Sequence, residues 1–158
     1  MTKEGAHSAS ELEDLLRRLE EAWQAFMDVL EGPDPERFAV EDAAGQSIRQ
    51  VLERTADDLN FCYERLVARA LSLPRPPCLQ KAEFGSLREA VVSLQRAHRR
   101  FCNLLHDLIP ADLARTATDE KLGTYTLRQL LEMTTAQYAM RAQQTQHILA
   151  QTFEGNQR

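Results

Sequence analysis

The segment SLREAVVSLQRAHRRFCNLLHDL, residues 86–108, decides the fold class of this chain. Its apolar residues recur at alternating spacings of four and three, the period of a buried stripe along an α-helix in a bundle. The stripe contains one histidine, His98, and consists of Leu87, Val91, Leu94, His98, Phe101, Leu105 and Leu108. Ser86 is a favourable N-cap, and Pro110 cannot continue a helix. The segment therefore predicts a bundle helix over residues 87–108.

Three further amphipathic helices are predicted, over residues 11–30, 48–71 and 127–149. Every predicted helix starts with the capping-box pattern, a serine or threonine followed three residues later by glutamate or glutamine. The pairs are Ser10 with Glu13, Ser47 with Gln50, Ser86 with Glu89 and Thr126 with Gln129. No stretch alternates with period two over the length of a strand, so we expect an all-α four-helix bundle. The connections are long enough to permit a crossover.

Length and composition predict one globular domain over residues 1–158. The chain has 158 residues, 43% of them hydrophobic and 27% charged, which suits a single core over about residues 11–150. The ends, residues 1–9 and 151–158, are expected to be mobile. Three cysteines without a close pair predict neither a disulfide nor a zinc motif.

The charge balance and the lack of long apolar runs exclude several classes of partner. A net charge of −5 does not indicate the positively charged surface that nucleic-acid binding needs. No run approaches the length of about 18 apolar residues that a membrane span needs, and the N-terminus has no apolar signal region. We therefore expect a cytoplasmic protein that binds neither nucleic acid nor membrane.

Polar residues interrupt the inward stripe of the last predicted helix. Leucines begin this stripe and Ile148 resumes it, but the intervening positions are Thr134, Gln137, Tyr138, Arg141 and Thr145. Arg141 falls near the centre of the inward face, where a charge must be paired or hydrated. Asp58, on the inner side of the second predicted helix, is the best candidate partner, followed by Asp57.

Three segments in order resemble the DinB/YfiT-like superfamily of four-helix bundles. Residues 45–57, GQSIRQVLERTAD, are similar to the signature of its second helix, and residues 108–113, LIPADL, to its leucine-proline corner. Residues 126–131, TLRQLL, followed by Gln137, Arg141 and Gln144, are similar to its last helix. The resemblance spans about residues 12–149.

This resemblance implies a divalent metal, zinc or nickel, held by one histidine of the second helix and two of the last. It also implies a metal-dependent hydrolase or a thiol transferase. In this chain the three positions are Arg54, Gln137 and Arg141. A guanidinium has only hydrogen-bond donors and stays protonated, so it cannot ligate a metal. We therefore predict no metal and no other cofactor, assign no catalytic residue, and regard an enzyme as the weaker interpretation.

Three interpretations of function follow. In the first, the polar core is either a closed network, the simpler account, or a pocket for a small anionic ligand. Its candidate residues are Arg54, Asp58, His98, Gln137, Tyr138 and Arg141. In the second, a hydrolase or thiol transferase keeps a displaced metal through His98 and the pair Asp57 and Asp58. In the third, the chain is an interaction module that forms a homodimer through outward apolar residues such as Phe61, Leu73 or Val92.

Overall fold

Four long helical segments form the bundle in the computed structural model, which describes the backbone of residues 3–155 and the side chains of residues 9–152. The second of these segments is divided by a π-helical turn, and a short hairpin precedes the last helix. The main elements are α1 (Lys3–Glu31), α2 (Ile48–Asp58), the π turn (Leu59–Tyr63), α3 (Glu64–Ala70), α4 (Leu87–Leu104), β1 (Thr116–Asp119), β2 (Gly123–Thr126) and α5 (Leu127–Gly155). Short 3-10 helices lie at Pro35–Arg37 and Pro110–Ala114. The predicted four-helix bundle is confirmed.

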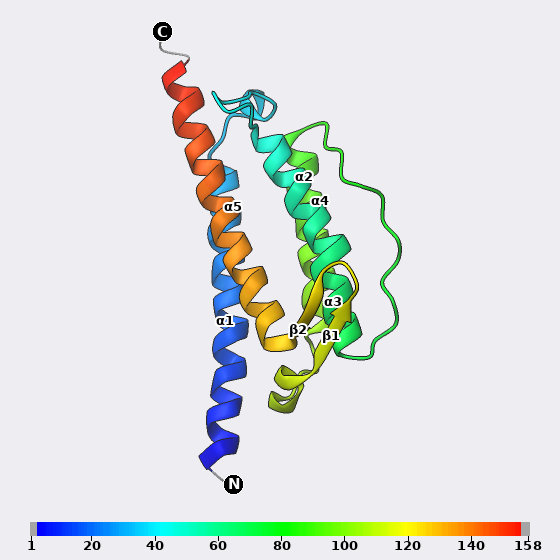
Figure 1. Cartoon of the computed structure of the whole chain (residues 1–158). Helices are drawn as coiled ribbons and strands as arrows, with labels where there is room; N and C mark the ends of the chain where they lie inside the picture. The colour runs from blue at the N-terminus through cyan, green and yellow to red at the C-terminus, as the bar shows by residue number, and fades with distance from the viewer. Residues whose placement is uncertain (1–2, 156–158) are drawn as a thin grey trace.

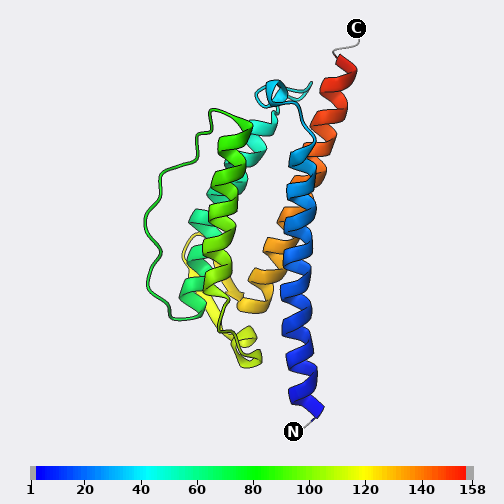
Figure 2. The ribbon, with the colours of Figure 1, turned by 180° about the vertical axis from the view of Figure 1, so that it is seen from behind.

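The helices run in two parallel pairs, so the bundle contains a crossover. α1 and α5 pack together and point the same way, while α2, α3 and α4 point the opposite way (Figures 1 and 2). The connection over residues 71–86 returns along the outside of the bundle from the end of α3 to the start of α4. At roughly 3.3 Å per residue, this loop easily covers the roughly 27 Å length of α4.

Three of the four predicted helix starts are correct. Ser47 and Thr126 each make both hydrogen bonds of a capping box, with Gln50 and Gln129 respectively. Ser86 accepts from the backbone of Glu89 at 3.1 Å, but the Glu89 carboxylate accepts from the Gly85 backbone instead. These side chains satisfy amides that would otherwise be orphaned at the first turn.

The predicted start at Ser10 is wrong, because α1 begins at Lys3 and continues through this residue. Residues 3–9 and 151–155 extend α1 and α5 as helix, and the mobility of the chain ends stays a prediction. Residues 1–2 and 156–158 lie outside the described part of the chain. A cap pattern gives only a local preference of about 1 kcal/mol, so it does not by itself fix where a helix begins.

The short hairpin was not predicted. β1 and β2 pair antiparallel, with Thr116 opposite Thr126 and Asp119 opposite Gly123. Each strand has four residues, too short to display a clear period of two. The turn is held by the Asp119 carboxylate, which accepts from two backbone amides, and by Gly123 at φ 101°. The all-α description therefore needs this one addition.

The π turn at Leu59–Tyr63 changes which face of the second helical segment is buried. Its closing bond runs from the Glu64 amide to the Leu59 carbonyl, one residue further than in an α-helix. The extra residue rotates the following face by about 100°. Consequently Thr55 and Ala56 are buried before the turn, Leu59 at its start, and Leu66, Val67 and Ala70 after it. None of the described helices is long and apolar enough to cross a membrane.

We expect Ser47→Ala to lower the free energy of unfolding by about 1 kcal/mol, because it removes the cap of α2 and leaves an amide unsatisfied. Ser10→Ala is the matched control, since Ser10 is exposed within α1 and should change stability by less than about 0.5 kcal/mol. Urea unfolding of both variants measures the difference. Equal effects of the two substitutions would contradict the observed helix starts.

Candidate functional site

A polar layer, which we call the Asp58 network, joins α2 to α5. It consists of Asp58, Gln137, Arg141 and Gln144. Asp58 Oδ2 accepts from Gln137 Nε2 at 2.5 Å and from Arg141 Nη2 at 3.0 Å. Arg141 Nη1 donates to Gln144 Oε1 at 2.9 Å. The predicted pairing of Arg141 with Asp58 is therefore present in the structure.

Helix geometry places these groups together. Gln137 and Arg141 are four residues apart on α5, so both project from one face toward Asp58 at the end of α2. The Arg141 side chain is 6% exposed, whereas that of Asp58 is 33% exposed. The pair is thus buried on the arginine side and hydrated on the carboxylate side. Asp58 also lines a small pocket of about 170 Å³ together with Tyr63 and Tyr125.

Arg54 does not belong to this layer. It lies one turn before Asp58 on α2 and is exposed to solvent. The buried face of α2 is formed by Ile48, Val51, Leu52, Thr55 and Ala56. Our assignment of Arg54 to the candidate cavity is therefore corrected: the polar face of α2 turns this long cationic side chain into water, where its charge costs least.

Asp57, our second choice as partner of Arg141, has a different role. Its carboxylate accepts from the backbone amide of Ala82 at 2.8 Å and so holds the crossover loop against α2. Asp57 and Asp58 point to different neighbours because consecutive residues on a helix lie about 100° apart. The pair does not form a shared site with His98.

A second polar group, which we call the His98 cluster, consists of Glu20, Trp23, His98, Cys102 and Tyr138. His98 Nδ1 lies 2.9 Å from the Tyr138 hydroxyl, and Nε2 lies 3.2 Å from Glu20 Oε2. Cys102 Sγ is 3.3 Å from Nε2, and the Trp23 ring stacks on the imidazole at 4.1 Å between centroids. If Nε2 carries the proton and donates to Glu20, the Tyr138 hydroxyl donates to Nδ1.

Burial keeps the His98 cluster in its neutral forms, apart from Glu20, which is exposed. It lowers the pKa of His98, against the opposing effect of Glu20. It raises the pKa of Cys102 to about 11, assisted by the charge of Glu20, and raises the pKa of Tyr138 well above its ordinary value. Cys102 is therefore a thiol at neutral pH, and its reactivity as a nucleophile is low.

The six sequence-predicted site residues thus separate into two groups and one outlier. Asp58, Gln137 and Arg141 meet in the Asp58 network, His98 and Tyr138 meet in the His98 cluster, and Arg54 is exposed. Sequence reasoning missed the contributions of Glu20, Trp23 and Cys102. Cys102 was detectable, because a histidine and a cysteine four residues apart share a helix face. Glu20 was not, because an exposed acidic residue on α1 looks like any other solvated residue.

The fold and the site define a four-helix bundle with a crossover and a polar layer between its second and last helical segments. Residues 10–145 match the DinB superfamily, so the chain belongs to that superfamily. The solved structure entitled "Crystal structure of TT2238, a four-helix bundle protein" is similar, with a TM-score of 0.65 and 20% sequence identity. The similarity covers 86% of this chain and 98% of that chain. A comparison with curated proteins found no match.

The residues at the positions where the resemblance implies metal ligands do not fit a divalent cation. Arg141 brings a positive charge, and the Gln137 amide nitrogen and the Arg141 guanidinium already direct their donors at Asp58. Asp58 alone supplies a carboxylate there, and Arg141 occupies it. A cation at this point would have to displace the guanidinium and leave a buried charge unpaired, which costs several kcal/mol by the usual order of magnitude.

The lowered pKa of His98 predicts that acid destabilises the fold. The unfolded state binds a proton more readily than the folded state, so the free energy of unfolding is fully kept above about pH 6.5 and falls as the pH drops below it. The slope should reach at most about 1.4 kcal/mol per pH unit.

Urea unfolding at several pH values, in buffers containing EDTA, measures this slope. His98→Gln should lack the part of this slope that His98 causes, although the variant is less stable at every pH. Burial raises the pKa of Glu64, and this makes acid stabilise the fold, opposite to the effect of His98. Because Glu64 is present in both proteins, its contribution cancels when the pH slope of His98→Gln is subtracted from that of the original chain. An unchanged pH dependence in His98→Gln would refute the assignment to His98.

Proposed function

We propose that this member of the DinB superfamily uses the Asp58 network as a structural replacement for the metal centre, and that the chain serves in binding or interaction rather than in metal-dependent catalysis. The supporting observation is that Asp58 Oδ2 accepts from both Gln137 and Arg141. Two of the three positions at which the resemblance implies metal ligands are thereby tied to an internal carboxylate.

A closed network is better supported than an anion site in the same place. Both terminal nitrogens of Arg141 have internal acceptors, and a bidentate anion needs two parallel donors of a guanidinium. The Arg141 Nε is buried and lacks a partner among the described residues, yet a single nitrogen cannot hold an oxyanion in this manner. The internal acid therefore competes effectively with any foreign anion.

The cytoplasmic location and the homodimer stay predictions. Leu73 and Val92 are exposed, at 40% and 38%, as the homodimer interpretation requires. Phe61 is half-buried and lies under the guanidinium of Arg65, so it is a weaker candidate for a dimer contact.

We expect Arg141→Met to reduce the free energy of unfolding by about 2–4 kcal/mol, because it breaks a largely buried ion pair. Asp58→Ala should cost at least as much, since it leaves the guanidinium, the more buried partner, without a carboxylate. The double variant should be more stable than the sum of the two losses predicts, by at least about 1 kcal/mol.

Arg54→Met is the matched control for this double-mutant cycle of Asp58 and Arg141. It removes the same charge from an exposed position one turn before Asp58 and should lower the free energy of unfolding by less than about 0.5 kcal/mol. Chemical unfolding provides all of these values. Additive losses in the cycle, or an Arg54→Met effect as large as that of Arg141→Met, would exclude a structural role for the network.

A displaced metal is the second candidate function, and one observation favours it. The donor atoms of Glu20, His98 and Cys102 lie within 4.8 Å of one another. Carboxylate, imidazole and thiolate are all zinc ligands, and three of them leave one position open. The metal would have to displace the thiol proton of Cys102, whose pKa of about 11 opposes binding. The cluster differs from our earlier set, because Asp57 and Asp58 are not in it.

Metal analysis separates the two candidates. Protein purified without an affinity tag should contain no stoichiometric zinc, nickel, iron or manganese, and Zn²⁺ titrated by calorimetry should not bind saturably. Saturable binding that Cys102→Ser abolishes would support the displaced metal. Cys62→Ser is the control, since Cys62 is another half-buried free cysteine outside the cluster. Binding that survives Cys102→Ser but is lost in Asp58→Ala would contradict both candidates.

A further inference from the structure

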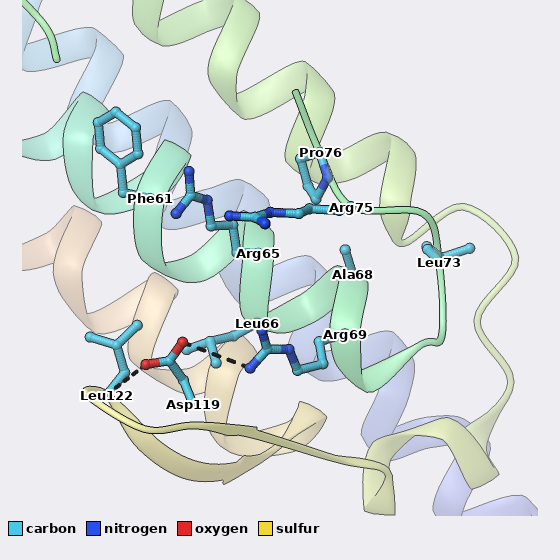
Figure 3. Close-up of a pocket in the computed structure, with 10 residues that line it drawn as sticks. All are labelled: Phe61, Arg65, Leu66, Ala68, Arg69, Leu73, Arg75, Pro76, Asp119 and Leu122. Carbon is cyan, nitrogen blue, oxygen red and sulfur yellow. Dashed lines mark hydrogen bonds and ion pairs between the residues drawn. The ribbon is translucent and has the colours of Figure 1, made fainter. Parts of the chain in front are cut away.

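A pocket rich in arginine lies where α3, the crossover loop and the β-hairpin meet. Its volume is about 210 Å³, and its charged lining residues are Arg65, Arg69, Arg75 and Asp119. Figure 3 shows that Arg65 and Arg69 come from the second helical segment, Arg75 from the loop and Asp119 from the hairpin. The Asp58 network, which lies between α2 and α5, does not contribute a charged group to this pocket.

The charges in this pocket are not balanced. Three arginines face one aspartate, and that aspartate is engaged by Arg69, with 3.7 Å between Asp119 Oδ2 and Arg69 Nη1. Arg69 also donates to the Thr118 carbonyl, so its guanidinium serves to hold the hairpin on α3. Within residues 9–152, neither Arg65 nor Arg75 forms an ion pair within 4 Å, although the neighbouring Glu64 carboxylate interacts with the charge of Arg65. This local excess of positive charge occurs in a chain whose net charge is −5.

The two unpaired arginines are arranged to converge. Figure 3 shows the Arg75 side chain extending from the loop toward Arg65. The Arg65 guanidinium makes a cation–π contact, with its carbon 5.3 Å from the centre of the Phe61 ring. Its Nε is buried and has no acceptor among the described residues. Two like charges that line one pocket repel each other, and an anion between them would relieve that repulsion.

The rest of the pocket is apolar. Leu66 is buried on the floor, and Leu122 closes one side from the hairpin. An inorganic oxyanion would use only the arginines and leave these side chains facing water. A ligand that has both an oxyanion and a compact apolar group would use both parts of the lining.

We propose that this pocket binds a small organic anion, with a carboxylate or phosphate head group held by Arg65 and Arg75 and an apolar group packed on Leu66 and Leu122. A guanidinium presents parallel donors that match either head group. The volume of about 210 Å³ is below the roughly 300 Å³ at which usual ligand pockets begin, so the ligand is small. This inference is independent of the role proposed for the Asp58 network.

Calorimetric titration with four probes tests the proposal. Phenyl phosphate and benzoate carry both parts of the ligand, inorganic phosphate carries only a head group, and benzyl alcohol only the apolar group. We expect saturable binding of at least one of the first two, at least about ten-fold tighter than inorganic phosphate or benzyl alcohol. If neither phenyl phosphate nor benzoate binds, or if inorganic phosphate binds equally well, the proposal is overturned.

Substitutions then locate the binding. Arg65→Gln and Arg75→Gln should each weaken the aryl anion by about ten-fold or more, because each removes a charge-assisted hydrogen bond. Arg99→Gln is the control, since it removes the same charge from an exposed position on α4 outside the pocket lining. Leu122→Glu, in the exposed hairpin, should abolish binding by replacing an apolar contact of the ligand with a carboxylate, which also repels the anion.

Circular dichroism and thermal unfolding establish that each variant is folded. Because Leu122 is 36% exposed, its substitution should leave the bundle intact even if Arg65→Gln disturbs the packing on Phe61. Equal losses of affinity in Arg65→Gln, Arg75→Gln and Arg99→Gln would show a nonspecific charge effect and would refute this site.

Discussion

The buried guanidinium of Arg141 constrains the centre of this bundle. A charge with a side chain 6% exposed requires a counter-charge at hydrogen-bond distance, and Asp58 provides it across the interface between α2 and α5. This requirement sets the register of the two helices, because Gln137 and Arg141, one turn apart, must both reach the same carboxylate oxygen. It also puts a positive charge at one of the positions where the resemblance implies a metal ligand. This charge needs an anion beside it, and Asp58 of the same chain supplies that anion.

The crossover determines what surrounds this layer. Because α3 and α4 are parallel, the chain must travel the length of the bundle between them, and the loop over residues 71–86 remains on the outside. Arg75 is carried on that loop to the side of α3, and the hairpin brings Asp119 and Leu122 to the same place. The arginine-rich pocket is therefore a product of topology. Its walls come from three elements that no short sequence motif connects.

Much of the fold could be predicted because its signals are local or periodic. The spacing of Leu87, Leu94 and Phe101 predicts a buried helix face, and the caps at Ser47 and Thr126 mark helix starts. Prediction failed where a tertiary contact overrode a local signal. Ser10 has a cap pattern inside a longer helix, and Arg54 was placed inward by its resemblance to a ligand position although solvation favours the surface. The partners of His98 could not be found from the sequence, because Glu20 lies far away along the chain on another helix.

The sequence by itself determined four helical segments, membership in a family of bundles, and the presence of a charge on the inward face of α5. These properties follow from periodicity and side-chain chemistry, which are local. Only the tertiary structure decided which acid pairs with Arg141, that Tyr138 faces His98 rather than the same network, and that Arg65 and Arg75 line one pocket. The reason is that a pairwise interaction depends on distances of a few ångströms between residues far apart in the sequence. His98 and Tyr138 are 40 positions apart, and Asp58 and Arg141 are 83 positions apart.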